Sequence, residues 1–256
     1  MNDPFQKLEG RGRITQKPSS LDAARNRLLR ATTWISAWLM LALLVYIVWE
    51  ITSTAAPAMG TFGADFLFTR TWDVVGGNFG ILPQIWGTLY SSLLALLIAG
   101  FFGVTIAIFL TQDFLPPGLA ALLRNVIELL AAIPSVVYGL WGIYVVIPML
   151  RPVAGWLNDH VGWIPLFATE LSGPGMAPAA LVLAIMVLPT VTAISQDGLR
   201  AVPHKMKEAV FGMGATRWEA IIHVILPAAS ASIFGALVLG LGRALGETMA
   251  LAMLVG

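Results

Sequence analysis

The stretch "LPQIWGTLYSSLLALLIAGFFGVTIAIFL", residues 82–110, contains no charged side chain and decides the fold class. A helix needs about 20 predominantly apolar residues to cross the hydrocarbon core of a bilayer, and this run is longer than that. The extra length allows the helix to tilt or to begin with an interfacial turn. We therefore expect residues 82–110 to form a membrane-spanning helix.

The composition of the whole chain agrees with this interpretation. Hydrophobic residues make up 57% of the sequence and charged residues 11%, whereas a soluble domain has about 25% charged residues. Such a chain cannot cover itself with a polar surface, so we expect it to lie in lipid. The absence of cysteine from the sequence excludes disulfides, thiolate nucleophiles and cysteine metal sites.

Four further apolar runs are long enough to span a bilayer. They cover about residues 33–51, 119–150, 177–195 and the segment from Pro227 to the last residue. Pro134 lies in the middle of the third run and is expected to kink or break its helix. The sequence therefore predicts an all-α integral membrane protein with five transmembrane helices.

Basic residues are concentrated at two places. Four lie in loop 198–226, and loops 52–80 and 151–176 hold one arginine each. Seven more fall within the first 30 residues: Lys7, Arg11, Arg13, Lys17, Arg25, Arg27 and Arg30. The positive-inside rule places the N-terminus and loop 198–226 in the cytoplasm.

The domain organisation follows from these segments. We expect residues 1–32 to form a basic, loosely ordered cytoplasmic tail and residues 33–256 to form a transmembrane domain. Because no folded domain accompanies the basic tail, we do not expect a nucleic-acid partner.

Loop 198–226 has helical features of its own. Pro203 is suited to opening a short helix, Gly212 and Gly214 allow a sharp turn, and Thr216 can cap a second helix that continues to Pro227. A short amphipathic helix in this position either docks a soluble partner or lies flat at the lipid headgroups.

The sequence "EAVFGMGATRWEAIIHVILP", residues 208–227, resembles the EAA loop of ABC importer permeases. Val210 and Val224 depart from that pattern by small changes that keep the size class. The resemblance implies that the short helix sits in a groove of an ATP-binding subunit and transmits ATP-driven closure to the membrane helices. The residues that match the pattern are Glu208, Ala209, Gly214, Leu226 and Pro227.

Three further stretches resemble the PstC-type permeases of ABC phosphate importers. They are "FGILPQIWGTLYSS" (79–92), "ELLAAIPSVVYGLWG" (128–142) and "GLGRALGETMA" (240–250). The resemblance implies a type I ABC importer permease bundle in the bacterial inner membrane. It also implies three partners: a second permease of the PstA type, a dimer of ATP-binding subunits and an extracytoplasmic phosphate-binding protein. Permeases of this type have a sixth span, which we expect this sequence to lack.

The chain carries no nucleotide-binding motif of the G-x-x-x-x-G-K-[ST] type, so we expect ATP and magnesium to be bound by the partner ATPase. His160, His204 and His223 show no metal-ligand spacing, so we expect no metal site and no cofactor in this chain. The chain is therefore expected to be a transport subunit and not an enzyme.

Arg243 and Glu247 interrupt the last apolar run. Arg243 lies about 24 Å along a helix that starts at Pro227, and a charge at that depth is costly. Its guanidinium fork matches the oxygens of a tetrahedral anion, and we expect Glu247, one helical turn further on, to share its helix face. We expect Arg243 to meet the transported phosphate and Glu247 to orient or release it. The alternative is a bridge from Arg243 to Glu128 or Glu247 that locks the bundle.

Three more residues are candidates for the substrate path. Glu128 lies near the start of the third run and is either part of the path or interfacial. Ser135 and Tyr138 follow Pro134, and their hydroxyls either line the path or satisfy backbone groups freed by the proline.

Two other functions fit parts of the pattern. One arginine matches any tetrahedral oxyanion, so sulfate or molybdate is an alternative substrate. A membrane-embedded transferase would use Glu128, Glu247 and a histidine as acid and base, which requires those groups to converge.

Overall fold

A computed structural model describes residues 19–112, 114–163 and 173–255. The chain forms two compact units, Met1–Gly80 and Ile81–Gly256, which are considered separately. In the described part of the chain, five helices are long and apolar enough to cross a membrane, which confirms the expected fold class.

The first unit consists of a long helix and a small hairpin. Helix α1 runs from Ser20 to Phe62 and is followed by α2 (Asp65–Phe68). Strands β1 (Trp72–Asp73) and β2 (Asn78–Phe79) pair antiparallel. The Phe79 ring meets Phe62 and Trp72 edge-on, with ring centroids 5.5 Å and 5.1 Å away, which packs the hairpin onto the helix end.

Helix α1 corrects the expected boundaries of the tail. It begins at Ser20, where the Ser19 side chain caps it by accepting from the Leu21 N–H, so residues 20–32 are helical and not loosely ordered. It also continues past residue 51 into the expected loop. Residues 1–18 lie outside the described residues.

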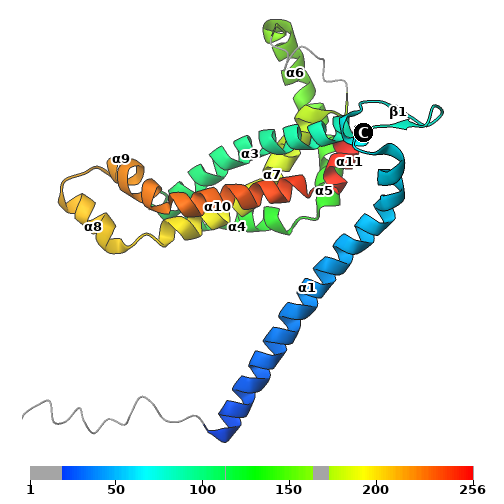
Figure 1. Cartoon of the computed structure of the whole chain (residues 1–256). Coiled ribbons are helices and arrows are strands. Elements are labelled where there is room, and N and C mark those ends of the chain that lie inside the picture. The colour runs from blue at the N-terminus through cyan, green and yellow to red at the C-terminus, as the bar shows by residue number, and fades with distance from the viewer. Residues whose placement is uncertain (1–18, 113, 164–172, 256) are drawn as a thin grey trace, which may run out of the picture. The chain divides into compact units, whose positions relative to one another are not determined.

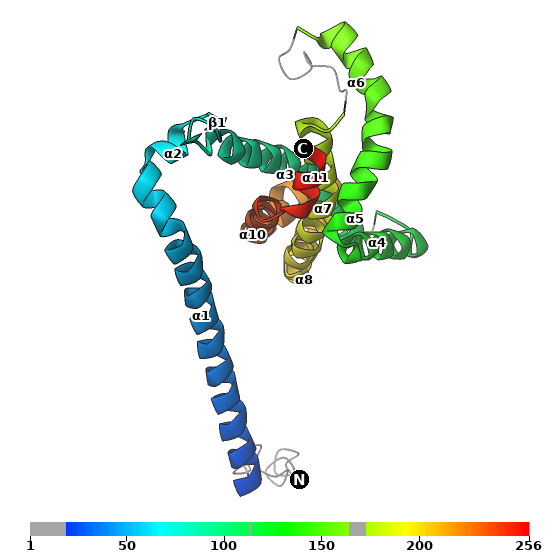
Figure 2. The ribbon, with the colours of Figure 1, turned by 90° about the vertical axis from the view of Figure 1, so that its right-hand side faces the viewer.

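Three helices form the core of the second unit, as Figures 1 and 2 show: α3 (Leu82–Thr111), α7 (Met176–Arg200) and α10 (Leu226–Leu245). Small side chains allow close approach, because a Cβ on Gly240 of α10 would lie only 2.8 Å from Val191 Cγ2 of α7. Helix α3 offers a buried residue every fourth position on one face: Ala95, Ala99, Gly103 and Ala107. The expected spans at 82–110 and 177–195 are thereby confirmed as helices.

The third apolar run is not one helix, which corrects the expected span at 119–150. It forms α4 (Pro117–Ala132) and, after a break at Ile133 and Pro134, α5 (Ser135–Trp141). The helix then continues through a π-helical turn η1 (Gly142–Val146) into α6 (Ile147–Val161), within the expected loop 151–176. The chain changes direction at the break (Figure 1), as expected for Pro134.

Two π-helical turns accommodate prolines inside helices. Turn η1 ends two residues before Pro148, and turn η2 (Ile221–Ile225) ends two residues before Pro227. A proline ring clashes with the carbonyl four residues earlier, and the wider π turn relieves that clash. As a result the fifth membrane helix runs unbroken from Arg217 to Leu245, and it does not start at Pro227.

Loop 198–226 contains the two expected helices. Helix α8 (His204–Gly212) follows Pro203, and α9 (Arg217–Ala220) follows Thr216. Gly214 lies between them with φ +87°, a conformation that favours glycine. Helix α11 (Met249–Val255) ends the described chain.

Candidate functional site

Arg243 lies in the last turn of α10 and reaches across to α7. Its Nη1 atom donates to Thr190 Oγ1 at 2.9 Å, a contact between residues 53 positions apart. The remaining guanidinium N–H groups make no hydrogen bond to a residue described here, and the side chain is exposed. Arg243 is therefore held in place at one nitrogen while the rest of its donor fork is available.

Glu247 does not share a helix face with Arg243, which corrects the expectation. Helix α10 ends at Leu245, and Gly246 forms its C-cap. Glu247 lies in the break before α11, where its Oε1 accepts from the Ala250 N–H at 3.2 Å. The carboxylate therefore caps the first turn of α11, where the helix dipole favours a negative charge.

The expected locking bridge is also absent from the described parts of the second unit. Arg243 forms no ion pair with Glu247, and it forms none with Glu128, which is exposed on α4. The structure therefore does not support an ion-pair lock within this chain.

Glu247 instead lines a cavity at one end of the bundle. The cavity has a volume of about 520 Å³ and lies between α3, the start of α7 and α11. Its polar lining consists of Gln84, Thr88, Ser91, Glu247 and Thr248. We call it the Glu247 pocket.

Tyr138 spans the break in the third apolar run. Its side chain is 4% exposed, and its hydroxyl donates to the Leu130 carbonyl at 2.8 Å. That carbonyl belongs to the last turn of α4, and Pro134 leaves it without a backbone N–H partner. The Tyr138 hydroxyl therefore satisfies this freed backbone group, which is the second of the two roles expected for it. Ser135 is the first residue of α5 and is half-buried.

Arg243 and Tyr138 lie on helices that pack against the same neighbour. Helix α7, which carries Thr190, packs against both α10 and α5. Arg243 and Thr190 are hydrogen-bonded across α10 and α7, and Tyr138 belongs to the adjoining α5. Glu128 is not brought into hydrogen-bond or ion-pair contact with this group, within the residues that are described.

Sequence reasoning missed Thr190 as the partner of Arg243. Thr190 directly follows Pro189 inside α7 and is half-buried. No local pattern connects a threonine with an arginine 53 positions away. The available signal was a polar side chain next to a proline in a mostly apolar span.

Helix α8 has two distinct faces. His204, Lys207, Glu208 and Phe211 follow helical spacing and line one side, whereas Ala209 is exposed on another. Val210 is buried and holds the helix to the bundle. The EAA-loop residues Glu208 and Ala209 therefore point in different directions.

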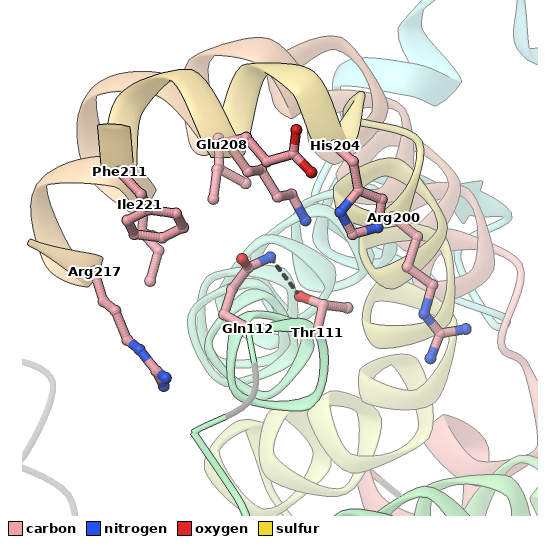
Figure 3. A pocket seen from close by; sticks show the side chains of 10 residues that line it. Thr111, Gln112, Arg200, His204, Glu208, Phe211, Arg217 and Ile221 are labelled. Carbon is pink, nitrogen blue, oxygen red and sulfur yellow. Dashed lines mark hydrogen bonds between the residues drawn. The ribbon is translucent and has the colours of Figure 1, made fainter. Parts of the chain in front are cut away.

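The first face of α8 borders a second cavity, which we call the basic pocket (Figure 3). Its volume is about 570 Å³. The lining comes from the ends of α3 and α7 and from α8, α9 and η2: Thr111, Gln112, Arg200, His204, Lys207, Glu208, Phe211, Arg217, Ile221 and Ile225.

The turn after α8 is fixed by a capping box. The Thr216 hydroxyl accepts from the Glu219 N–H at 3.3 Å, and the Glu219 carboxylate accepts from the Thr216 N–H at 2.8 Å. This arrangement confirms Thr216 as the cap of the second helix.

Leu226 and Pro227 then join η2 to α10 in one continuous helix. The loop is thus mechanically continuous with the helix that carries Arg243.

The histidines do not form a metal site. Across residues 19–112, 114–163 and 173–255, no group of three or more His, Cys, Asp or Glu side chains is placed to hold a metal ion. His160 stacks on Trp156 with ring centroids 4.6 Å apart.

These features together define a multi-pass membrane bundle with an arginine held between helices and a short helix projecting at one end, the architecture of a transport permease. Residues 103–256 match the family of binding-protein-dependent transport system inner membrane components, and the chain belongs to this family. Permeases of this class work with an ATPase and a substrate-binding protein.

Curated relatives match most of the chain. "Phosphate transport system permease protein PstC" of Mesorhizobium japonicum is 38% identical over 239 residues, which cover 91% of this chain and 73% of the relative. The protein with the same name in Xylella fastidiosa is 40% identical over 199 residues, covering 76% and 61%. That of Pasteurella multocida is 38% identical, covering 90% and 73%. The relatives are transport permeases, so the transferase alternative is excluded.

A solved structure shows the same fold. Inward-facing conformations of the MetNI methionine ABC transporter contain a chain with a TM-score of 0.50 and 18% sequence identity. The similarity covers 63% of this chain and 68% of the other. It supports the importer permease fold.

Proposed function

We propose that this chain is a transmembrane subunit of an ATP-driven phosphate importer and forms half of the translocation path. The observation that carries the proposal is Arg243, held by Thr190 at 2.9 Å with the rest of its donor fork unused by the described residues. The PstC relatives support phosphate as the substrate.

Arg243 has the chemistry for a transient oxyanion contact. A guanidinium stays charged at all physiological pH values and offers paired donors to two oxygens of a tetrahedral anion. Its hydrogen bond to a neutral threonine leaves its charge uncompensated, so an arriving anion does not have to displace a carboxylate. Tyr138 and Ser135 belong to α5, which packs against the Thr190-bearing helix α7, and Glu247 lies at the break before α11.

Glu247 and Glu128 have secondary roles in this proposal. Glu247 caps α11 and presents its carboxylate to a cavity lined by neutral polar groups. A negative charge there repels an anion and favours its departure toward Arg243. Glu128 is exposed on α4, where a second permease subunit or the membrane interface surrounds it.

Coupling to ATP hydrolysis runs through α8 in our proposal. The outward residue Ala209 docks on the ATP-binding subunit, which binds ATP and magnesium. Glu208 faces the basic pocket, and the buried Val210 holds α8 to its own chain. Gly214 allows the turn, and Leu226 and Pro227 pass the motion into α10 without a break in the helix.

The chain lies in the bacterial inner membrane in this proposal, with the N-terminus and α8 on the cytoplasmic side. Basic residues of the N-terminal segment and of loop 198–226 support this orientation. A PstA-type permease completes the path, and a phosphate-binding protein docks on the extracytoplasmic side.

Uptake by proteoliposomes tests the proposal. The full transporter is reconstituted with its second permease, ATPase subunits and binding protein, and uptake of labelled phosphate, sulfate and molybdate is measured with internal ATP. We expect phosphate uptake only. Uptake of sulfate or molybdate in place of phosphate would identify another oxyanion importer and overturn the phosphate assignment.

A further inference from the structure

The basic pocket collects positive charge from separate elements. Arg200 is the last residue of α7, His204 and Lys207 belong to α8, and Arg217 is the first residue of α9. Glu208 is the one carboxylate among the residues that line it. Even with His204 neutral and Arg217 left out, the two cations Arg200 and Lys207 face the single carboxylate of Glu208, so the pocket carries excess positive charge.

This charge is directed inward by the spacing of α8. His204, Lys207, Glu208 and Phe211 lie on the face that lines the pocket, whereas Lys205 of the same helix does not line it. Lys205 is exposed on another side of α8. Figure 3 shows His204 and Gln112 extending into the space between α8 and the ends of α3 and α7.

Hydrogen-bond donors reinforce the preference for an anion. Gln112 Nε2 donates to Thr111 Oγ1 at 3.1 Å and presents this amide at the end of α3. Arg200 donates to Gln196 Oε1 at 3.3 Å, which uses one of its five N–H groups. Helix α8 begins at His204 without a side-chain cap, so its first amides add donors at the same end.

We propose that the basic pocket binds a phosphate-type oxyanion, either inorganic phosphate on the cytoplasmic side or the phosphate of an anionic lipid headgroup. The orientation and the link to transport rest on the proposed function. Occupancy joins α8 to the ends of α3 and α7, because the anion is held by Lys207 of α8 and Arg200 of α7 beside the Gln112 amide. A bound anion therefore restrains the coupling helix and slows ATP hydrolysis.

Binding of labelled phosphate tests the site. The complete complex, without binding protein, is placed in nanodiscs of zwitterionic lipid, and every variant also carries Arg243→Ala so that the translocation path does not contribute. We expect Lys207→Gln and Arg200→Gln each to weaken phosphate binding by about tenfold, as loss of a charged hydrogen bond predicts. Lys205→Gln removes the same charge from the outward side of α8 and is expected to leave binding unchanged.

Two results would overturn the pocket proposal. One is loss of all phosphate binding in the complex that carries Arg243→Ala alone, and the other is equal weakening of binding by Lys205→Gln and Lys207→Gln. The proposed function is tested independently, because phosphate uptake by the transporter with an intact Arg243 does not require the pocket to bind phosphate.

The lipid source is tested with nanodiscs that contain phosphatidylglycerol. Loss of phosphate binding in these nanodiscs, together with Lys207-dependent retention of phosphatidylglycerol in native mass spectra, identifies a lipid headgroup as the occupant. Phosphate binding that persists identifies free phosphate. Absence of both phosphate binding and Lys207-dependent lipid retention would overturn the proposal.

Discussion

Helices α1 and α7 are both apolar enough to cross a membrane, yet they differ in almost everything else. No residue of α1, which is described over its full length, is buried, whereas α7 has buried residues from Pro178 to Leu199. The surface of α1 carries its own large apolar side chains, while α7 packs against small residues of α3 and α10. Hydropathy thus identifies a membrane helix in each unit, and small side chains at the helix contacts account for the burial of α7 within its own unit.

The largest expected effect comes from a leucine truncated in each helix. Leu183 of α7 is 2% exposed, and Leu44 of α1 is 61% exposed. We expect Leu183→Ala to lower the free energy of unfolding by about 2–5 kcal/mol, because it leaves a cavity in the packed core. Leu44→Ala should change it by less than about 0.5 kcal/mol. Unfolding of the detergent-purified chain by titrated SDS measures both, and equal losses would contradict the comparison.

A second prediction concerns the small residues that let the helices meet. A methyl group on Gly198 of α7 would clash with the Ser232 Cβ of α10, whereas nothing lies within 4 Å of a methyl group on Gly235 of the same α10 helix. Gly198→Ala should cost about 1–3 kcal/mol through overpacking. Gly235→Ala should be neutral or stabilise by up to about 1 kcal/mol, because alanine is the better helix former.

The same unfolding assay distinguishes the two glycine variants. Gly198→Ala is expected to lower the free energy of unfolding, and Gly235→Ala is expected not to lower it. If both variants unfold like the unsubstituted chain, the close approach of α7 and α10 is wrong.

The smallest expected stability effect is at the helix break. Tyr138→Phe removes the 2.8 Å hydrogen bond to the Leu130 carbonyl and should lower stability by about 1 kcal/mol. Tyr144 is 74% exposed and provides the matched control, for which Tyr144→Phe should have no effect. A phosphate uptake rate that falls in Tyr138→Phe without any loss of stability would instead assign Tyr138 to the substrate path.

Much of the fold could be predicted because its signals are local. Apolar length indicated the number of spans, Pro134 marked the break between α4 and α5, and Thr216 marked the start of α9. The alanines and glycine at every fourth position of α3 were also a readable sign of a packed face, since small residues at that spacing line one side of a helix.

The wrong predictions arose where rules that use only neighbouring residues did not account for the backbone geometry and packing of the folded chain. Pro227 does not begin a helix, because the π turn η2 accommodates its ring. Glu247 does not share a face with Arg243, because α10 ends at Leu245 and the helical count of four residues no longer applies. The contact of Arg243 with Thr190 joins two helices and has no local signature.

Phosphate uptake by an Arg243→Ala transporter tests the central claim most directly. Removal of the guanidinium should lower uptake by about 10- to 100-fold, since a hydrogen bond to a charged group contributes about 1.5–3 kcal/mol. The complex should still assemble, because Arg243 is exposed and makes one side-chain hydrogen bond to the described chain. Unchanged uptake by an assembled Arg243→Ala complex would contradict the account, because the arginine would then have no part in moving the anion.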